Sequence, residues 1–158
     1  LINKKNYSTQ ILLQHIKSCI ALKLSSEARN TFILLKNYSV EKNILDLVEV
    51  QILIAEGRKA EALNLIQKAL SEYSGKIKSN FYYEKSRIAS NDDQKLSDLR
   101  SFLTANPRNP EALFALYEYY FKKADYRKAQ YYLRQVVALN PESKKLAELN
   151  AKLDTLIN

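Results

Sequence analysis

Small apolar residues return along this chain at an interval close to the length of two helices and a turn. Ala28 and Ala62 lie 34 residues apart, and further steps of 34 and 33 residues lead to Leu96 and Ala129. The residues four and seven places downstream repeat as well. They are Phe32 and Leu35, Ile66 and Ala69, and Leu133 and Val136. Such a period is typical of stacked helical hairpins, so the sequence predicts an all-α fold.

The repeat divides the chain into four expected hairpins and a closing helix. A flank at 1–7 precedes a single domain at 8–158, whose hairpins cover 8–40, 41–75, 76–108 and 109–140 and whose closing helix covers 141–157. Ser8 or Thr9 is suited to cap the first helix. Gly57 supplies the permissive backbone of a turn, and Asn109 followed by Pro110 opens a helix. The third hairpin has the weakest pattern.

The composition suits helices and excludes a membrane span. The 158 residues are 46% hydrophobic and include only two glycines and three prolines. No apolar run approaches the ~20 residues that a spanning helix needs. The formal charge of +8 is spread along the chain without a basic block, which favours acidic partners more than nucleic acid. The chain begins without Met, and we expect it to be a piece of a longer protein. The sequence does not assign this protein to a cellular compartment.

The fourth unit resembles a tetratricopeptide repeat. Its residues at the signature positions of that family are Leu113, Leu116, Tyr120, Tyr126, Ala129, Leu133, Val136 and Pro141. The second unit is similar between Gly57 and Leu70, and the other two units are similar more loosely. The resemblance implies a right-handed solenoid with a capping helix. The family usually has a small residue where Ile16, Val50, Glu84 and Tyr117 stand, which implies wider or rotated packing of the two helices here.

The resemblance also implies a binding groove, because the first helix of each hairpin lines a concave surface in this family. By position, the groove residues are Leu13, Lys17, Leu47, Gln51, Phe81, Lys85, Phe114, Glu118, Phe121 and Lys122. An apolar, aromatic channel with lysines at its edge fits an amphipathic or aromatic protein segment with acidic flanks. The alternative is that the aliphatic members simply pack between neighbouring units.

Tyrosines are concentrated in the fourth unit. Tyr117, Tyr119 and Tyr131 are expected to be partly exposed and to form a secondary interface, whereas Tyr120 and Tyr126 are expected in the core. Exposed tyrosines give a large and rigid contact area at interfaces. Packing with only the hydroxyl in water is the alternative.

The sequence offers no catalytic pattern, and it predicts no cofactor and no metal site. His15 and Cys19 are the only residues of their types, too few for a zinc site. A buried Cys19 is favoured over a reactive thiol. The favoured function is a non-enzymatic scaffold module within a bacterial assembly protein, where family analogy points to envelope, pilus, secretion or flagellar machinery. The alternatives are self-association and RNA binding through a basic helical repeat.

Overall fold

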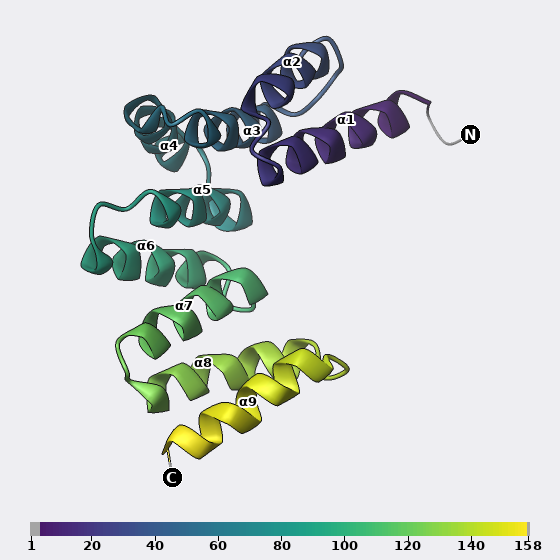
Figure 1. Ribbon diagram of the computed structural model, residues 1–158. Coiled ribbons are helices and arrows are strands. Elements are labelled where there is room, and N and C mark those ends of the chain that lie inside the picture. The colour runs from purple at the N-terminus through teal and green to yellow at the C-terminus, as the bar shows by residue number, and fades with distance from the viewer. Residues whose placement is uncertain (1–3, 158) are drawn as a thin grey trace. The chain divides into compact units, whose positions relative to one another are not determined.

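The computed structural model describes residues 4–157, with side chains from residue 8 onward. All of the regular structure in this part of the chain is helical (Figure 1). The helices are α1 (Lys4–Ala21), α2 (Ser25–Leu35), α3 (Lys42–Ala55), α4 (Lys59–Glu72), α5 (Gly75–Arg87), α6 (Asp92–Ala105), α7 (Pro110–Lys122), α8 (Tyr126–Leu139) and α9 (Lys144–Ile157). The chain divides into two compact units that meet in sequence between Ile88 and Ala89, inside the third expected hairpin.

The first unit contains α1 to α5 and two adjoining cores. α1 packs against α2, and α3 packs against α1, α2, α4 and α5. One core joins α1, α2 and α3 through Ile16, Phe32 and Ile52. The other joins α3, α4 and α5 through residues such as Ile66 and Phe81. Helix α3 therefore contributes side chains to both cores, and it is apolar over a wider arc than a helix that buries one face.

The second unit contains α6 to α9, each packed against the next along the chain. Leu113 and Leu116 of α7 and Leu133 of α8 are buried. The closing helix α9 packs on α8 and buries Leu153, whereas Leu156 is half exposed near its end. A single amphipathic helix thus follows the last hairpin, as the sequence predicts.

Three hairpins turn in the same way. Lys23, Gly57 and Ala124 each have a positive φ, of 61°, 77° and 57°. In each turn the next residue's N–H donates to a carbonyl five residues back: Leu24 to Cys19, Arg58 to Leu53, and Asp125 to Tyr120. These bonds satisfy the last carbonyls of the first helix. The connection between α5 and α6 has no positive φ, and this matches the weakness of the third repeat in the sequence.

The start of α7 agrees with the sequence, whereas the starts of the first and the last helix differ from it. The side chains of Asn91 and Asn109 cap α6 and α7 by accepting from the N–H groups of Gln94 and Ala112. However, α1 already includes Lys4, before the expected Ser8 or Thr9, so residues 4–7 of the expected flank at 1–7 are helical, and residues 1–3 of that flank lie outside the described residues. The closing helix begins at Lys144 rather than Pro141.

The positions that are usually small in tetratricopeptide repeats hold larger residues, and all of them are buried. Ile16, Val50, Glu84 and Tyr117 are 1%, 0%, 2% and 6% exposed. Glu84 is a buried carboxylate that accepts from Gln51 Nε2 at 2.8 Å and from Arg87 Nη1 at 2.7 Å. The four equivalent positions are thus all buried. Glu84 can be buried with its charge because these two hydrogen bonds compensate the desolvation of its carboxylate.

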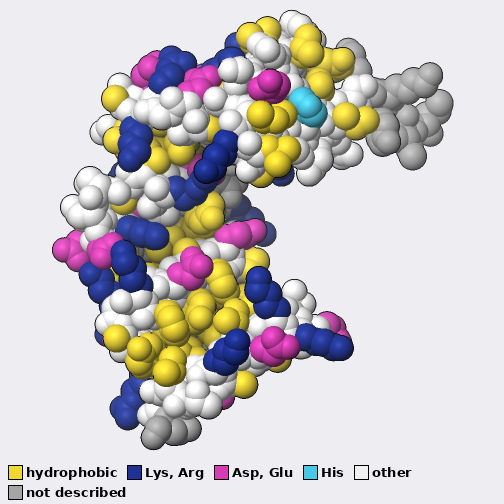
Figure 2. All heavy atoms as spheres, in the orientation of Figure 1, with side chains coloured by type: hydrophobic (Ala, Val, Ile, Leu, Met, Phe, Trp, Pro, Cys, Tyr) yellow, Lys and Arg dark blue, Asp and Glu magenta, His cyan; other side chains and the backbone are white. Residues whose placement is uncertain are grey.

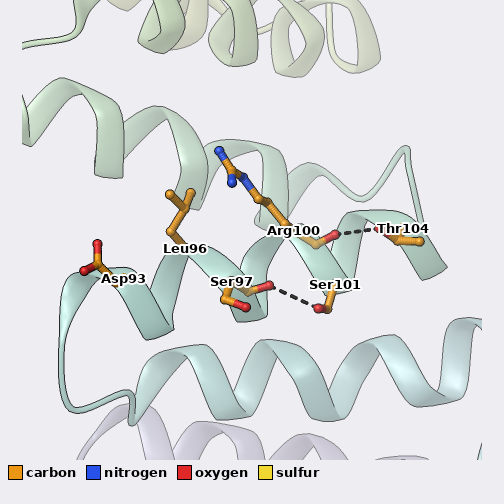
Figure 3. Close-up of a pocket in the computed structure, with 6 residues that line it drawn as sticks. All are labelled: Asp93, Leu96, Ser97, Arg100, Ser101 and Thr104. Carbon is orange, nitrogen blue, oxygen red and sulfur yellow. Dashed lines mark hydrogen bonds between the residues drawn. The ribbon is translucent and has the colours of Figure 1, made fainter.

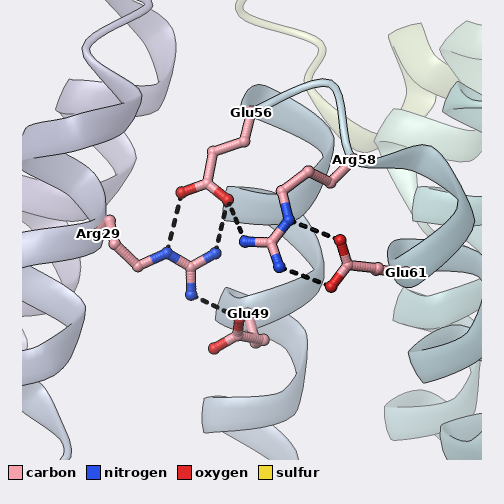
Figure 4. A network of polar contacts seen from close by, with 5 residues as sticks. All are labelled: Arg29, Glu49, Glu56, Arg58 and Glu61. Carbon is pink, nitrogen blue, oxygen red and sulfur yellow. Dashed lines mark hydrogen bonds and ion pairs between the residues drawn. The ribbon is translucent and has the colours of Figure 1, made fainter.

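A chain of alternating charges connects α2, α3 and α4 in the first unit (Figure 4). Arg29 lies between Glu49 and Glu56, and Glu56 also accepts from Arg58, which pairs with Glu61. Hydrogen bonds from Arg29, followed by those from Arg58, hold the pKa of Glu56 below its usual range. The network fixes the first two hairpins to each other.

Candidate functional site

The expected groove residues of the first unit mostly support the core. Leu13 and Leu47 are half-buried and pack against the two cores. Phe81 is fully buried and stacks on Tyr73 with a ring-centroid distance of 5.6 Å. The placement of Phe81 in a groove is therefore corrected: its ring fills the space between α3, α4 and α5 and has no surface left for a partner.

The polar groove candidates of the first unit divide in the same way. Gln51 is half-buried, and its amide is committed to Glu84 of α5. Lys85 is also half-buried, whereas Lys17 is exposed.

Two groove candidates of the second unit, Phe114 and Phe121 of α7, belong to a different kind of surface, which also includes Tyr117 of α7 and Tyr126 of α8. We call these four residues the α7 aromatic face. The rings follow one another with centroid distances of 5.2, 5.8 and 5.6 Å. Residues three and four apart share one side of a helix, which explains the row along α7. Phe121 is 42% exposed, and Phe114 and Tyr126 are half-buried. Hydrophobic side chains gather over α7 and α8 in Figure 2.

Tyr117 is the buried member of the α7 aromatic face. The sequence predicted a partly exposed ring, but the ring is only 6% exposed because Phe114 and Phe121 flank it along the helix. Burial, with a smaller contribution from the charge of Glu118, raises the pKa of the Tyr117 hydroxyl. Tyr117 therefore supports its neighbours rather than offering a contact of its own. Glu118 and Lys122 are exposed beside the face.

A second row of rings contains the other tyrosines of this unit. Tyr119 meets Tyr120 edge-on, Tyr120 stacks on Tyr132 at 5.6 Å, and Tyr132 meets Tyr131 edge-on at 5.1 Å. Tyr120 is buried as predicted, and its hydroxyl accepts from Arg100 Nη2 at 3.2 Å. Tyr131 is 64% exposed and Tyr119 is half-buried, which agrees with their expected exposure. Tyr132 joins the exposed ring of Tyr131 to the buried ring of Tyr120.

A hollow of about 420 Å³ lies along one side of α6 (Figure 3). Its hydroxyl groups serve the helix itself, because Ser101 donates to the Ser97 carbonyl at 3.1 Å and Thr104 donates to the Arg100 carbonyl at 3.0 Å. Asp93 and Leu96 complete the lining. All of these residues come from a single helix, and their polar groups do not converge on a common point as substrate-binding groups do.

His15 and Cys19 lie at the interface of α1 and α2. His15 Nδ1 is 3.0 Å from the Thr31 hydroxyl, and Cys19 Sγ is 3.7 Å from both ring nitrogens. Cys19 is 4% exposed, in agreement with the expected buried thiol. The pair contributes to the packing of the first hairpin.

Residues 4–157 contain no group of three or more His, Cys, Asp or Glu side chains that could hold a metal ion. Among the helices described, none has the length and apolar character required to cross a membrane. Comparison of the chain with protein-family models, with curated proteins and with solved structures gives no match.

Proposed function

We propose that this chain is a non-enzymatic protein-interaction module built as a right-handed solenoid of tetratricopeptide-like hairpins, with α9 as its cap. The equivalent turns at Lys23, Gly57 and Ala124 support a common hairpin geometry. The equal burial of Ile16, Val50, Glu84 and Tyr117 supports a common helix contact. Repeats of this kind bury their core between neighbouring units and leave side chains of the first helices for binding.

The observation that carries the binding function is the α7 aromatic face. Phe121 remains 42% exposed although it contacts both Tyr117 and Tyr126. Large apolar side chains fixed by their neighbours lose little conformational freedom when a partner covers them. Aromatic residues in such a setting contribute most of the affinity at many protein interfaces.

The partner that fits this face is an amphipathic or aromatic segment of another protein. Its apolar side chains would cover Phe114 and Phe121, and an acidic side chain would reach the exposed Lys122. The chain's net charge of +8 favours the approach of an acidic segment. Within a bacterial assembly protein, such a surface would join the scaffold to a second component.

The test is a pull-down that compares the wild type with a Phe114→Glu/Phe121→Glu variant. The matched control is Leu63→Glu/Ile77→Glu, because Leu63 and Ile77 are 40% and 39% exposed and lie in the first unit. We expect a protein that the wild type and the control retain and the α7 variant loses. Circular dichroism establishes that each variant is folded.

Three results would contradict the proposal. Equal retention by all three proteins would exclude the α7 aromatic face as the binding surface. A wild type that retains only copies of itself, with a mass by light scattering that rises with concentration, would favour self-association. A wild type that retains only RNA, released by salt, would favour nucleic-acid binding.

A further inference from the structure

The strongest unexplained feature of the second unit is an exposed ring on the polar side of α8. The core side of this helix is formed by Ala129, Leu133 and Val136, all buried. At 100° per residue, Tyr131 lies half a turn around the helix from these three residues. It is nevertheless 64% exposed, far more than its core-facing neighbours. A large aromatic ring in this place contributes little to the core.

Two arginines flank this ring on the same side of the helix. Arg127 precedes Tyr131 by four residues and Arg134 follows it by three, so all three share one stripe. With Gln130, Gln135 and Ala138 they line a shallow hollow of about 370 Å³. We call this surface the α8 arginine–tyrosine stripe.

The guanidinium groups of the stripe are available to an anion. Arg127 is exposed and makes no ion pair within the described part of the chain. Arg134 is 63% exposed, and its distance to Asp154 is 3.7 Å, which is a loose pair. The neighbouring Lys128 differs, because it is bound to Asp125 at 2.8 Å and lies over the Tyr120 ring. The free positive charge on α8 is thus concentrated beside Tyr131.

From this arrangement we propose that the α8 arginine–tyrosine stripe binds an acidic helix of a partner protein, separately from the α7 aromatic face. Seven residues separate the two arginines, which is about 10 Å along the helix axis. Two glutamates seven residues apart on a partner helix have the same spacing. An apolar side chain between them, four residues after the first glutamate, meets Tyr131. Arginine can bind each carboxylate through two parallel hydrogen bonds.

A peptide fits this surface better than a nucleic acid does. A nucleic-acid strand gains affinity from a long row of phosphate contacts, each with a basic side chain. The stripe offers two arginines, and the adjacent Lys128 is already neutralised by Asp125. Tyr131 is a single ring without a second exposed aromatic residue on the same side of α8 to stack a second base.

The test uses the 158-residue chain labelled with ¹⁵N and a synthetic helical peptide of alanines with two glutamates seven residues apart and a leucine between them. We expect amide shift changes centred on Arg127, Tyr131 and Arg134. Arg127→Glu/Arg134→Glu should weaken binding at least tenfold, and Tyr131→Ala about threefold. Lys144→Glu/Lys145→Glu makes the same change in charge on α9 and should alter affinity less than twofold.

Two further measurements separate this proposal from its rivals. Phe121→Glu should leave the peptide affinity unchanged, so that failure of the α7 aromatic face and failure of the stripe are distinguishable. A twelve-residue oligouridine should not displace the peptide. The proposal is overturned by absence of peptide shifts, by equal weakening in the α8 and α9 charge variants, or by oligouridine binding that is tighter than peptide binding and is lost in Arg127→Glu/Arg134→Glu.

Discussion

Arg29 on α2 grips the carboxylate of Glu56 with two parallel hydrogen bonds, from Nε to Oε1 at 2.9 Å and from Nη2 to Oε2 at 2.8 Å. A third nitrogen, Nη1, reaches Glu49 at 2.5 Å. Glu49 and Glu56 lie seven residues apart, so one guanidinium connects α2 to two positions of the following hairpin that are two helical turns apart. Arginine is the only cationic side chain whose donors form a planar fork, so it alone can bind one carboxylate with two parallel hydrogen bonds and reach a second carboxylate as well.

Arg29→Lys should therefore destabilise the first unit although it keeps the charge. Lysine can satisfy one carboxylate well, but it cannot form the paired bonds to Glu56. The Arg29 side chain is 22% exposed, and we expect a loss of about 1–2 kcal/mol in the free energy of unfolding. Urea denaturation of both proteins measures it. The control is Lys36→Arg, which exchanges one cation for another at the exposed residue that follows α2. If Arg29→Lys lost no more stability than this control, the paired hydrogen bonds to Glu56 would not stabilise the first unit.

The same network predicts how stability depends on acid. Hydrogen bonds from Arg29 lower the pKa of Glu56 in the folded chain below the value of 4.5 expected when it is unfolded. Between these values the unfolded chain binds the extra proton, so the contribution of Glu56 is complete above pH about 4.5 and is lost as the pH falls through the folded pKa. Glu56→Gln lacks this contribution at every pH.

Melting temperatures of the wild type and Glu56→Gln should therefore differ most near neutral pH and converge as the pH falls below about 4.5. Glu27→Gln provides the control, since Glu27 is an exposed glutamate on the same helix as Arg29. A constant difference between wild type and Glu56→Gln across this range would show that the Glu56 carboxylate is not stabilised by its arginines.

Phe81 and Phe121 should respond in opposite ways to truncation. Phe81 is fully buried, so Phe81→Ala removes a core ring and should cost about 3–5 kcal/mol of stability. Phe121 is 42% exposed, and Phe121→Ala should cost about 1 kcal/mol while it removes a contact for the partner. Thermal denaturation and partner binding measured on the same preparations test both. A severe loss of stability in Phe121→Ala would make that ring a core residue.

The repeated turn predicts a pair of substitutions with opposite signs. Gly57 has φ +77° and open space around the position of a Cβ, so Gly57→Ala adds backbone strain alone and should cost about 1 kcal/mol. Ala124 already has φ +57°, and Ala124→Gly should relieve that strain and stabilise the chain by up to about 1 kcal/mol. Denaturation midpoints measure both changes. Two changes of the same sign would contradict a shared turn.

The repeat and its local signals could be predicted from the sequence because they depend on neighbouring residues. Gly57 in a turn and Asn109 as a helix cap are confirmed. The predicted starts of α1 and α9 were wrong, because the two helices begin at Lys4 and Lys144. Nothing in the pattern requires the first helix to begin at Ser8, and Ser143, whose hydroxyl accepts from the Leu146 N–H at 3.4 Å, competes with Pro141 as a starting point for α9.

The exposure of individual groove residues could not be predicted in the same way. Phe81 and Phe114 occupy equivalent places in the repeat, yet Phe81 is fully buried and Phe114 is only half-buried. Tyr73, at the end of α4, stacks on Phe81 and helps to close its site. Burial at such a position depends on the neighbouring helices. The repeat pattern around Phe81 does not predict its contact with Tyr73. The α8 arginine–tyrosine stripe differs, because the helical spacing of Arg127, Tyr131 and Arg134 already predicts from the sequence that they share one side of a helix.

The turns at Lys23, Gly57 and Ala124 have a consequence for how such a chain changes over generations. Their bonds join backbone amides to backbone carbonyls, groups that every residue except proline carries alike. A lysine, a glycine and an alanine therefore perform the same task, at different energetic cost. The residues at a turn can therefore be substituted during evolution while its backbone conformation is kept. The hairpins of one chain can then diverge in sequence and still share the same fold.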